Sequence, residues 1–162
     1  MQRRRFIMSL LALGSIPLIS RQALSDSMNN SSSIKKIVKT DEEWRAILPR
    51  ERFEILRKAA TERPFSSPLN KEKRKGTYVC AGCDLELFTS EMKYDSGTGW
   101  PSFYTVIEGH VETERDFKLI WPRTEYHCAR CGGHQGHVFD DGPPPTGKRY
   151  CNNGLALKFV PA

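Results

Sequence analysis

The sequence lacks several features that would assign it to common protein classes. Its longest largely apolar stretch, residues 6–19, has 14 residues, which is too short to span a bilayer comfortably. No acidic residue precedes Asp26, yet four of the 25 basic residues do. The remaining 21 basic residues exceed the 19 acidic ones by only two, which is too small an excess to indicate a nucleic-acid partner. Apart from two Cys-x-x-Cys pairs, no internal repeat is present.

What is present indicates one small globular domain. The 162 residues suffice for a single domain, and 38% hydrophobic with 27% charged residues is a globular balance. Twelve glycines and ten prolines favour a loop-rich, mainly β body. We expect a monomer.

The N-terminus has the pattern of an export signal over residues 1–25. A basic start at Met1–Arg5 precedes the apolar stretch, and Ala23-Leu24-Ser25 offers the small residues that a signal peptidase requires. Arg3-Arg4-Arg5-Phe6-Ile7 resembles the twin-arginine signal, although Gln2 replaces its usual Ser or Thr. We expect export to a bacterial periplasm by that route. General secretion and an uncleaved membrane anchor remain alternatives, and after processing no stable membrane insertion is expected.

The mature chain divides into a linker and a domain. Residues 26–36 are rich in Ser and Asn and predict a flexible linker, so the domain is expected over 37–162. The capping box Thr40-x-x-Glu43 predicts a short helix through Leu48, and a second helix is predicted from Pro49 to Thr61. Turn residues delimit the predicted strands Gly76–Cys80, Ser102–Ile107, Val111–Thr113, Glu125–Cys128, Gly136–Phe139 and Ala156–Val160.

Four of the five cysteines form two Cys-x-x-Cys pairs, Cys80 with Cys83 and Cys128 with Cys131. Two such pairs can supply the four thiolates of a tetrahedral zinc site. Their separation of 44 residues predicts that the metal joins two β-hairpins. Two disulfides or a redox-active pair are the alternatives, but a redox pair usually lies in a βαβ unit, which this pattern lacks. Because four protein sulfurs leave no open position, we expect one structural Zn²⁺ per chain.

The fifth cysteine, Cys151, is a candidate nucleophile. A thiol attacks as thiolate, so it needs nearby positive charge or hydrogen-bond donors. On a strand, Arg149 and Asn153 would flank Cys151 on one face. A lone cysteine is otherwise most often a small buried apolar residue.

Two further segments carry candidate site residues. Three of the four histidines, His127, His134 and His137, cluster within eleven residues; a second metal site is conceivable there, but hydrogen-bonding or acid/base roles are preferred. Trp100 and Phe103 place two aromatic rings near a glycine-rich turn, where they would suit a small apolar substrate group such as a methyl.

Together these segments resemble the methionine-R-sulfoxide reductase family over residues 40–161. The matching stretches are Glu62–Phe65, Gly97–Phe103, His134–Pro143, Pro145–Gly147 and Arg149–Asn153. The resemblance implies a mainly β fold of two antiparallel sheets, with short N-terminal helices and a Cys₄ zinc site at the far end.

The resemblance also implies roles for individual residues. Cys151 matches the nucleophile and Trp100 the ring that meets the substrate methyl. The polar residues that orient substrate and water are matched by His134, His137, Asp141, Arg149 and Asn153.

Three departures from the family pattern stand out. Thr98 occupies the position where many members have a second, resolving cysteine. Asn152 replaces the usual apolar residue after the nucleophile, and the sequence of Phe117–Trp121 differs from the one usual in the family.

The expected chemistry is reduction of methionine sulfoxide, free or in oxidised proteins. Cys151 attacks the sulfoxide sulfur, and an imidazolium, His134 or His137, protonates the oxygen. Methionine leaves, and Cys151 becomes a sulfenic acid. Without a resolving cysteine, an external thiol, thioredoxin-like or a periplasmic relay, would reduce it. A non-catalytic zinc-bearing β module and a nucleic-acid-binding zinc ribbon are the alternatives; the low mature charge disfavours the ribbon.

Overall fold

A computed structural model describes residues 34–116 and 123–162. The predicted export signal, most of the predicted linker and the Phe117–Trp121 segment lie outside the described residues. Ile34 and Ile37 already pack against the hydrophobic core, and the Ile37 amide donates to the Arg130 carbonyl at 2.7 Å. The compact unit therefore includes Ile34, three residues before its predicted start. Among the described residues, no helix has the length and apolarity to cross a membrane.

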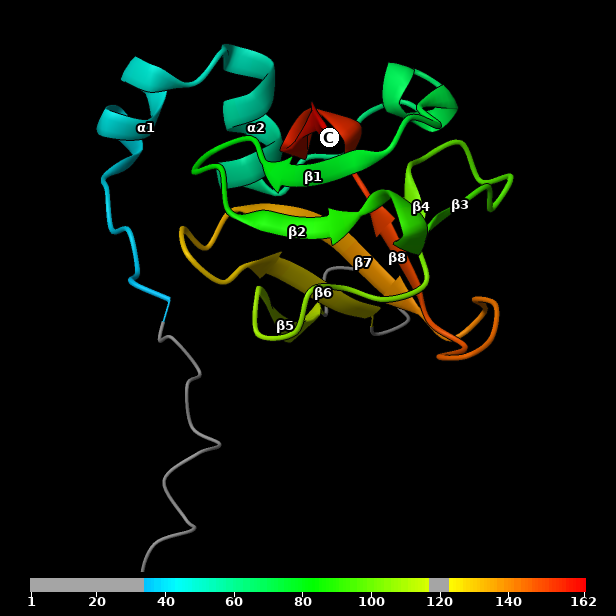
Figure 1. Cartoon of the computed structure of the whole chain (residues 1–162). Helices are drawn as coiled ribbons and strands as arrows, with labels where there is room; N and C mark the ends of the chain where they lie inside the picture. Colours follow the sequence, from blue (N-terminus) through cyan, green and yellow to red (C-terminus); the bar gives the residue numbers. More distant parts are fainter. Residues whose placement is uncertain (1–33, 117–122) are drawn as a thin grey trace, which may run out of the picture. The chain divides into compact units, whose positions relative to one another are not determined.

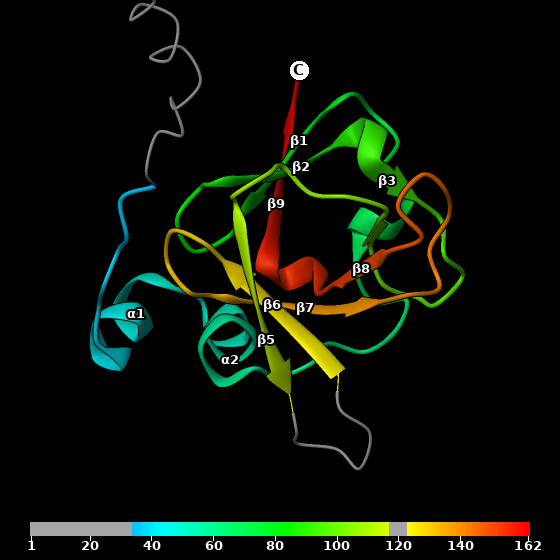
Figure 2. The same cartoon turned by 90° about the horizontal axis from the view of Figure 1, so that it is seen from below.

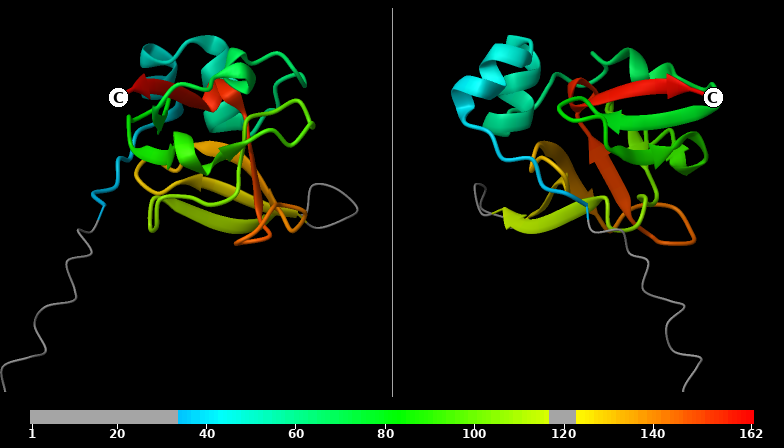
Figure 3. Two further views of the ribbon diagram at one scale, coloured as in Figure 1. Left: turned by 45° about the vertical axis from the view of Figure 1, so that its right-hand side comes forward. Right: turned by 60° about the vertical axis from the view of Figure 1, so that its left-hand side comes forward.

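The fold is mainly β, as predicted, with two antiparallel sheets (Figures 1 and 3). One sheet has the order β2-β1-β9, and the other has the order β3-β4-β8-β7-β6-β5. The smaller sheet consists of β1 (Gly76–Cys80), β2 (Glu86–Thr89) and β9 (Leu157–Pro161). The larger one consists of β3 (Lys93–Tyr94), β4 (Ser102–Phe103), β5 (Val111–Asp116), β6 (Arg123–Cys128), β7 (His134–Phe139) and β8 (Arg149–Asn152).

The helices lie beside the sheets and begin close to their predicted positions. In α1 (Asp41–Ile47) the predicted capping box forms: the Glu43 amide donates to the Thr40 hydroxyl, and the Thr40 amide donates to the Glu43 carboxylate. The second helix, α2 (Arg50–Lys58), ends three residues before the predicted end because Ala59 takes a left-handed conformation, φ 51°. Single 3₁₀ turns occur at η1 (Pro68–Lys71), η2 (Ser90–Met92) and η3 (Gly154–Ala156).

The strand predictions differ from the structure mainly where strands are short. Strand pairing stops after Phe103, although Ser102–Ile107 was predicted as a strand. In contrast β5 runs three residues beyond its predicted end, and β6 and β7 each begin two residues early, because neighbouring strands continue their pairing. Strands β2 and β3 were not predicted. They form by pairing with β1 and β4 at the edges of the two sheets. Such pairing depends on tertiary structure, so a local residue pattern predicts it poorly.

The core is aromatic and fills the space between the two sheets. Phe88 of β2 stacks on Phe103 of β4 with ring centroids 3.9 Å apart, and Tyr78 meets the edge of Phe103 at 5.0 Å. Tyr126 of β6 is also fully buried. Such ring pairs hold the sheets at a fixed separation. Because the apolar side chains fill this inner space, polar groups occupy the other face of the larger sheet.

Candidate active site and metal centre

Cys151 lies on β8, an inner strand of the six-stranded sheet. Its neighbours in the sheet are Ser102 of β4 on one side and His137 of β7 on the other. It lines a hollow of about 250 Å³. The residues around this hollow are Thr61, Thr98, Trp100, Arg123, Gly136, His137, Phe139, Arg149, Cys151, Asn152 and Asn153. The predicted grouping of Cys151 with Arg149, His137, Asn153 and Trp100 thus meets in one pocket.

The sequence analysis expected positive charge and donors beside Cys151 to favour its thiolate. In the structure, burial outweighs them, and the thiol is not ionised at rest. Burial raises its pKa above the ordinary value, while the charge of Arg149 and a hydrogen bond with the Thr98 hydroxyl act in the opposite direction without overcoming burial. At neutral pH the resting sulfur is therefore mainly a thiol. A base must remove its proton before attack.

Arg149 supplies the positive charge beside Cys151 and is itself held from two sides. Its Nε and Nη2 atoms donate to the two carboxylate oxygens of Asp141, both at 2.8 Å, and its guanidinium lies 4.2 Å from the centroid of the Phe139 ring. Asp141 does not line the pocket; it fixes Arg149, and that hydrogen bond lowers the pKa of Asp141. The site residue Asp141 thus acts through Arg149.

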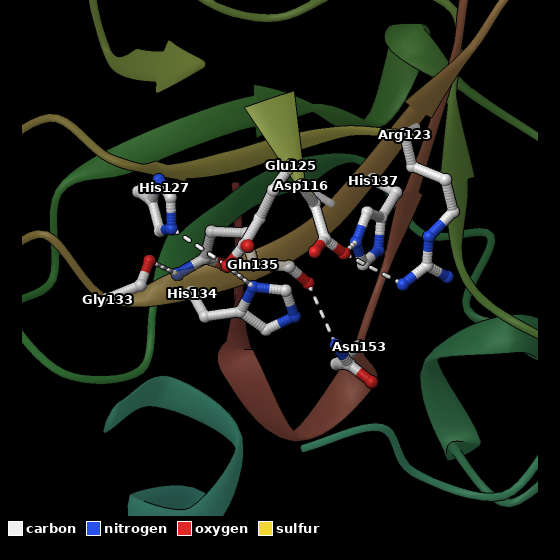
Figure 4. A network of polar contacts seen from close by, with 9 residues as sticks. All are labelled: Asp116, Arg123, Glu125, His127, Gly133, His134, Gln135, His137 and Asn153. Atoms are coloured by element: carbon white, nitrogen blue, oxygen red, sulfur yellow. Dashed lines mark hydrogen bonds and ion pairs between the residues drawn. The ribbon is translucent and has the colours of Figure 1, made fainter. Parts of the chain in front are cut away.

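Of the three clustered histidines, only His137 lines the pocket; Figure 4 shows all three with their carboxylate partners. His137 lines the pocket, and its Nε2 lies 3.0 Å from Oδ2 of Asp116. His134 is only 3% exposed and does not line the pocket; its Nδ1 lies 2.5 Å from Oε1 of Glu125. His127 Nε2 bonds the same oxygen at 2.8 Å. Glu125 therefore links His127 and His134, and only His137 reaches the pocket.

The predicted imidazolium is not the resting form of His134 or His137. Burial lowers the pKa of His134 to about 4, although Glu125 acts to raise it. Burial also lowers the pKa of His137, against the opposing hydrogen bond to Asp116. Both rings are neutral at pH 7. Neither ring therefore carries at rest the proton that the sequence-based expectation assigned to it.

Glu62 connects the aromatic and amide walls of the pocket, and sequence reasoning gave it no role. Its carbonyl accepts from Trp100 Nε1 at 3.2 Å, and its amide donates to Oδ1 of Asn153 at 3.1 Å. Its buried carboxylate accepts from the amides of Gly154 and Leu155, which directly follow Asn153. Glu62 thus fixes the distance between Trp100 and Asn153.

The prediction that Phe103 contacts substrate is wrong. Its ring is fully buried and stacks on Phe88 between the sheets. Phe103 pairs with Tyr150, next to Cys151, so its side chain points to the opposite face of the larger sheet from Cys151. Of the two predicted rings, only Trp100 lines the pocket.

Asp116, Arg123 and Glu125 are site residues that sequence reasoning missed. A weak signal was available for Glu125: it alternates with His127 around buried Tyr126, which places both polar residues on one face. No local pattern distinguishes Asp116 from the other charged residues of β5. Its place beside His137 comes from the pairing of three strands.

The four paired cysteines form one cluster at the distances of a metal site. The Sγ atoms of Cys80 and Cys131 are 3.6 Å apart, those of Cys83 and Cys128 are 3.4 Å apart, and all four lie within 4.8 Å of one another. Sulfurs 2.3 Å from a tetrahedral zinc would be about 3.8 Å apart. The thiols are free of disulfides, so the disulfide alternative is wrong and the residues fit a metal ion.

This cluster joins the two sheets and also contacts α2. Cys80 ends β1 of the smaller sheet, and Cys128 ends β6 of the larger one. Arg57 of α2 donates to the Cys131 carbonyl at 2.9 Å. The implied position at the far end from the helices is therefore incorrect, because α2 packs over the knuckle that carries Cys131.

The fold and the site define a class: a two-sheet protein with four cysteines placed to hold a metal ion and a separate thiol in a pocket. The SelR domain family matches residues 48–161. "Peptide methionine sulfoxide reductase MsrB" of Methanosarcina barkeri is 52% identical over 77% of this chain and 89% of that protein. The protein of the same name from Pseudomonas putida is 55% identical over 79% and 97%. The chain belongs to this family, the MsrB-type methionine-R-sulfoxide reductases.

Among solved structures, the Mis18 'Yippee-like' domain aligns with 55% of this chain and 98% of its own, at a TM-score of 0.44 and 16% identity. That likeness is too distant to carry an argument.

Proposed function

We propose that this protein reduces methionine R-sulfoxide to methionine through a sulfenic acid on Cys151, and so repairs oxidised proteins. One observation carries the proposal: the single cysteine outside the metal cluster lines a pocket together with Trp100, His137 and Arg149. The chain's 50–55% identity to reductases of peptide methionine sulfoxide supports the substrate. The pocket offers an indole to a methyl group and polar donors to an S=O group.

The chemistry uses the proton that Cys151 holds at rest. The Cys151 thiol transfers its proton to neutral His137, and the resulting thiolate attacks the sulfoxide sulfur. The imidazolium gives the proton to the sulfoxide oxygen. As the oxygen moves to the Cys151 sulfur, the methionine S–O bond breaks, leaving methionine and Cys151–SOH. Arg149 stabilises the thiolate that forms in between.

Regeneration requires a thiol from outside the chain. The other four cysteines are held in the cluster, and Thr98 occupies the position beside Cys151 from which its hydroxyl bonds the thiol. Two external thiols reduce Cys151–SOH to the thiol, releasing water and a disulfide. A thioredoxin-like protein or a periplasmic thiol relay fits this demand.

We also propose that the cluster ion is zinc, held by Cys80, Cys83, Cys128 and Cys131. Four thiolates match the ligand preference of zinc. Because four protein ligands leave no open coordination position, the ion would have a structural role. Arg3-Arg4-Arg5-Phe6-Ile7 and the apolar stretch that it opens support export by the twin-arginine route to the periplasm, with an N-terminal membrane anchor as the alternative. A monomer remains our expectation.

The deciding experiment is turnover of separated R- and S-epimers of methionine sulfoxide, free and within a peptide, with dithiothreitol as reductant. Wild type should reduce the R-epimer, and Cys151→Ser should be inactive while it keeps its metal and its circular dichroism spectrum. Without reductant, one methionine should form per chain together with one sulfenic acid. Equal activity of Cys151→Ser, or an internal disulfide at Cys151 after the single turnover, would contradict the mechanism.

A further inference from the structure

His137 has a buried carboxylate partner that is separate from the ion pair beside Cys151. Asp116 Oδ2 lies 3.0 Å from His137 Nε2 and 2.9 Å from Nη2 of Arg123. The Asp116 side chain is only 2% exposed. Figure 4 shows dashed lines that join the Asp116 carboxylate to the His137 imidazole and to the Arg123 guanidinium. A carboxylate placed in this way is held at two points, so it can hold the imidazole in turn.

Strand pairing places Asp116 and His137 in one row with Cys151, the proposed nucleophile. Cys151 of β8 is directly opposite His137 of β7, which is directly opposite Glu125 of β6. Arg123 is two residues before Glu125 and so shares its face, and Asp116 of β5 is directly opposite Arg123. Asp116 therefore reaches His137 diagonally across β6, a distance that polar side chains can bridge.

The chemistry of the pair determines which nitrogen of His137 carries the proton. A guanidinium offers only hydrogen-bond donors, so Asp116 Oδ2 accepts the hydrogen bond from Arg123 Nη2. His137 Nε2 must then donate to Asp116, which leaves Nδ1 as the basic nitrogen of the neutral ring. The opposite tautomer would point its only basic nitrogen at a carboxylate.

We propose that Asp116, held by Arg123, is the positioning residue that fixes His137 as the Nε2–H tautomer and so lets Nδ1 accept the Cys151 proton. This inference rests on the proposed function. The proton leaves Sγ for Nδ1, the S–H electron pair stays on sulfur, and Asp116 stabilises the imidazolium until the sulfoxide oxygen takes the proton. Asp116 accepts hydrogen bonds from His137 and Arg123 throughout and does not touch the substrate.

Charged and titratable groups on four strands lie around His137. Asp116 on β5 and Glu125 on β6 favour its protonated form, whereas Arg123 on β6 disfavours it. His134 on β7 lies 5.6 Å away, ring centroid to centroid, and Cys151 and Arg149 lie on β8. Burial lowers the pKa of His137 overall. Removing Asp116 should therefore lower that pKa further, and removing Arg123 should raise it.

The test measures kcat/KM for R-epimer turnover against pH in zinc-loaded variants. Asp116→Asn should lower kcat/KM about 100-fold and move the acidic limb of the profile to lower pH. Arg123→Gln should move that limb to higher pH. Glu114→Gln is the matched control: it removes an exposed carboxylate two residues earlier on β5 and should leave both readouts within about twofold.

A double-mutant cycle separates positioning from general damage. Asp116→Asn placed on His137→Gln should cost no further activity, because the residue that it positions is already gone. Independent losses in the cycle, or acidic limbs that stay in place, would overturn the inference while wild-type turnover keeps the proposed function. If Asp116→Asn does not fold, the direction of the shift in Arg123→Gln decides. No turnover by wild type would instead refute the function.

Discussion

At the scale of residues, the site depends on opposing effects on one sulfur. Burial raises the pKa of Cys151, and Arg149 and Thr98 act against that rise. A thiol kept protonated at rest is a poor target for stray oxidants, since the thiolate is the form that they attack. In the proposed mechanism the same proton would pass to the sulfoxide oxygen, so the resting site would contain both the nucleophile and the acid.

The pKa of Cys151 can be read from its alkylation by iodoacetamide. Because the pKa lies above the ordinary value, the rate in zinc-loaded protein should rise about tenfold per pH unit from pH 7 to pH 9 without a plateau. Arg149→Met removes the charge that lowers the pKa, so its alkylation at pH 8 should be slower. Mass spectrometry locates the label, and Cys151→Ser gives the background from the cluster. A plateau below pH 8 would show that the thiol is ionised at rest.

At the scale of elements, the site depends on the close approach of β7 and β8. Gly136 pairs with Asn152, and a Cβ at Gly136 would lie 1.9 Å from the Cys151 carbonyl oxygen. Only glycine allows the strands to approach so closely. This approach also places His137 directly beside Cys151.

Gly136→Ala should therefore separate β8 from β7 and damage both stability and activity. We expect a loss of about 3 kcal/mol in the free energy of unfolding, together with a fall in kcat/KM. Gly109→Ala is the control: its Cβ meets no atom within 4 Å, although φ is +74°, so it should cost only about 1 kcal/mol of backbone strain. Urea unfolding followed by circular dichroism compares the two. Equal losses would show that strand approach is unimportant.

The elements also show how far the sequence could predict this molecule. The capping box at Thr40 and the cysteine knuckles depend on short-range patterns, and these were predictable. The grouping of Trp100 and His137 with Cys151 was predicted from the resemblance to a family, because these residues lie far apart in the sequence. Phe103 was placed in the pocket because a motif reports neighbours along the chain and not the face of the sheet on which each side chain lies. The role of Asp116 depends on the pairing of β5, β6 and β7, which residue patterns do not encode.

At the scale of the whole molecule, one four-cysteine cluster joins both sheets and α2. Its four cysteines lie at or just after the ends of β1, in the smaller sheet, and β6, in the larger, and Figure 2 shows α2 beside β7. Zinc bound to peptide thiolates contributes roughly 10–16 kcal/mol, which is comparable to the entire stability of a domain, roughly 5–15 kcal/mol.

Removal of zinc should therefore unfold both layers together. Treatment with a strong chelator at 37 °C should abolish the cooperative thermal transition and release one zinc per chain, measured by elemental analysis. Cys83→Ser, which removes one ligand, should behave like the chelated protein, whereas Cys151→Ser should keep the zinc and the transition. A chelated protein that retains its melting temperature would show that the cluster is dispensable.

The inner position of Cys151 has a consequence for the order of events in turnover. Strands β4 and β7 flank Cys151, and the aromatic core lies beneath the sheet. A ligand therefore reaches the Cys151 sulfur from the pocket face of the sheet. In the proposed mechanism the sulfoxide substrate and the reducing thiol would both use this face, so they would bind in turn. Reduction of one methionine sulfoxide and regeneration of Cys151 would then alternate.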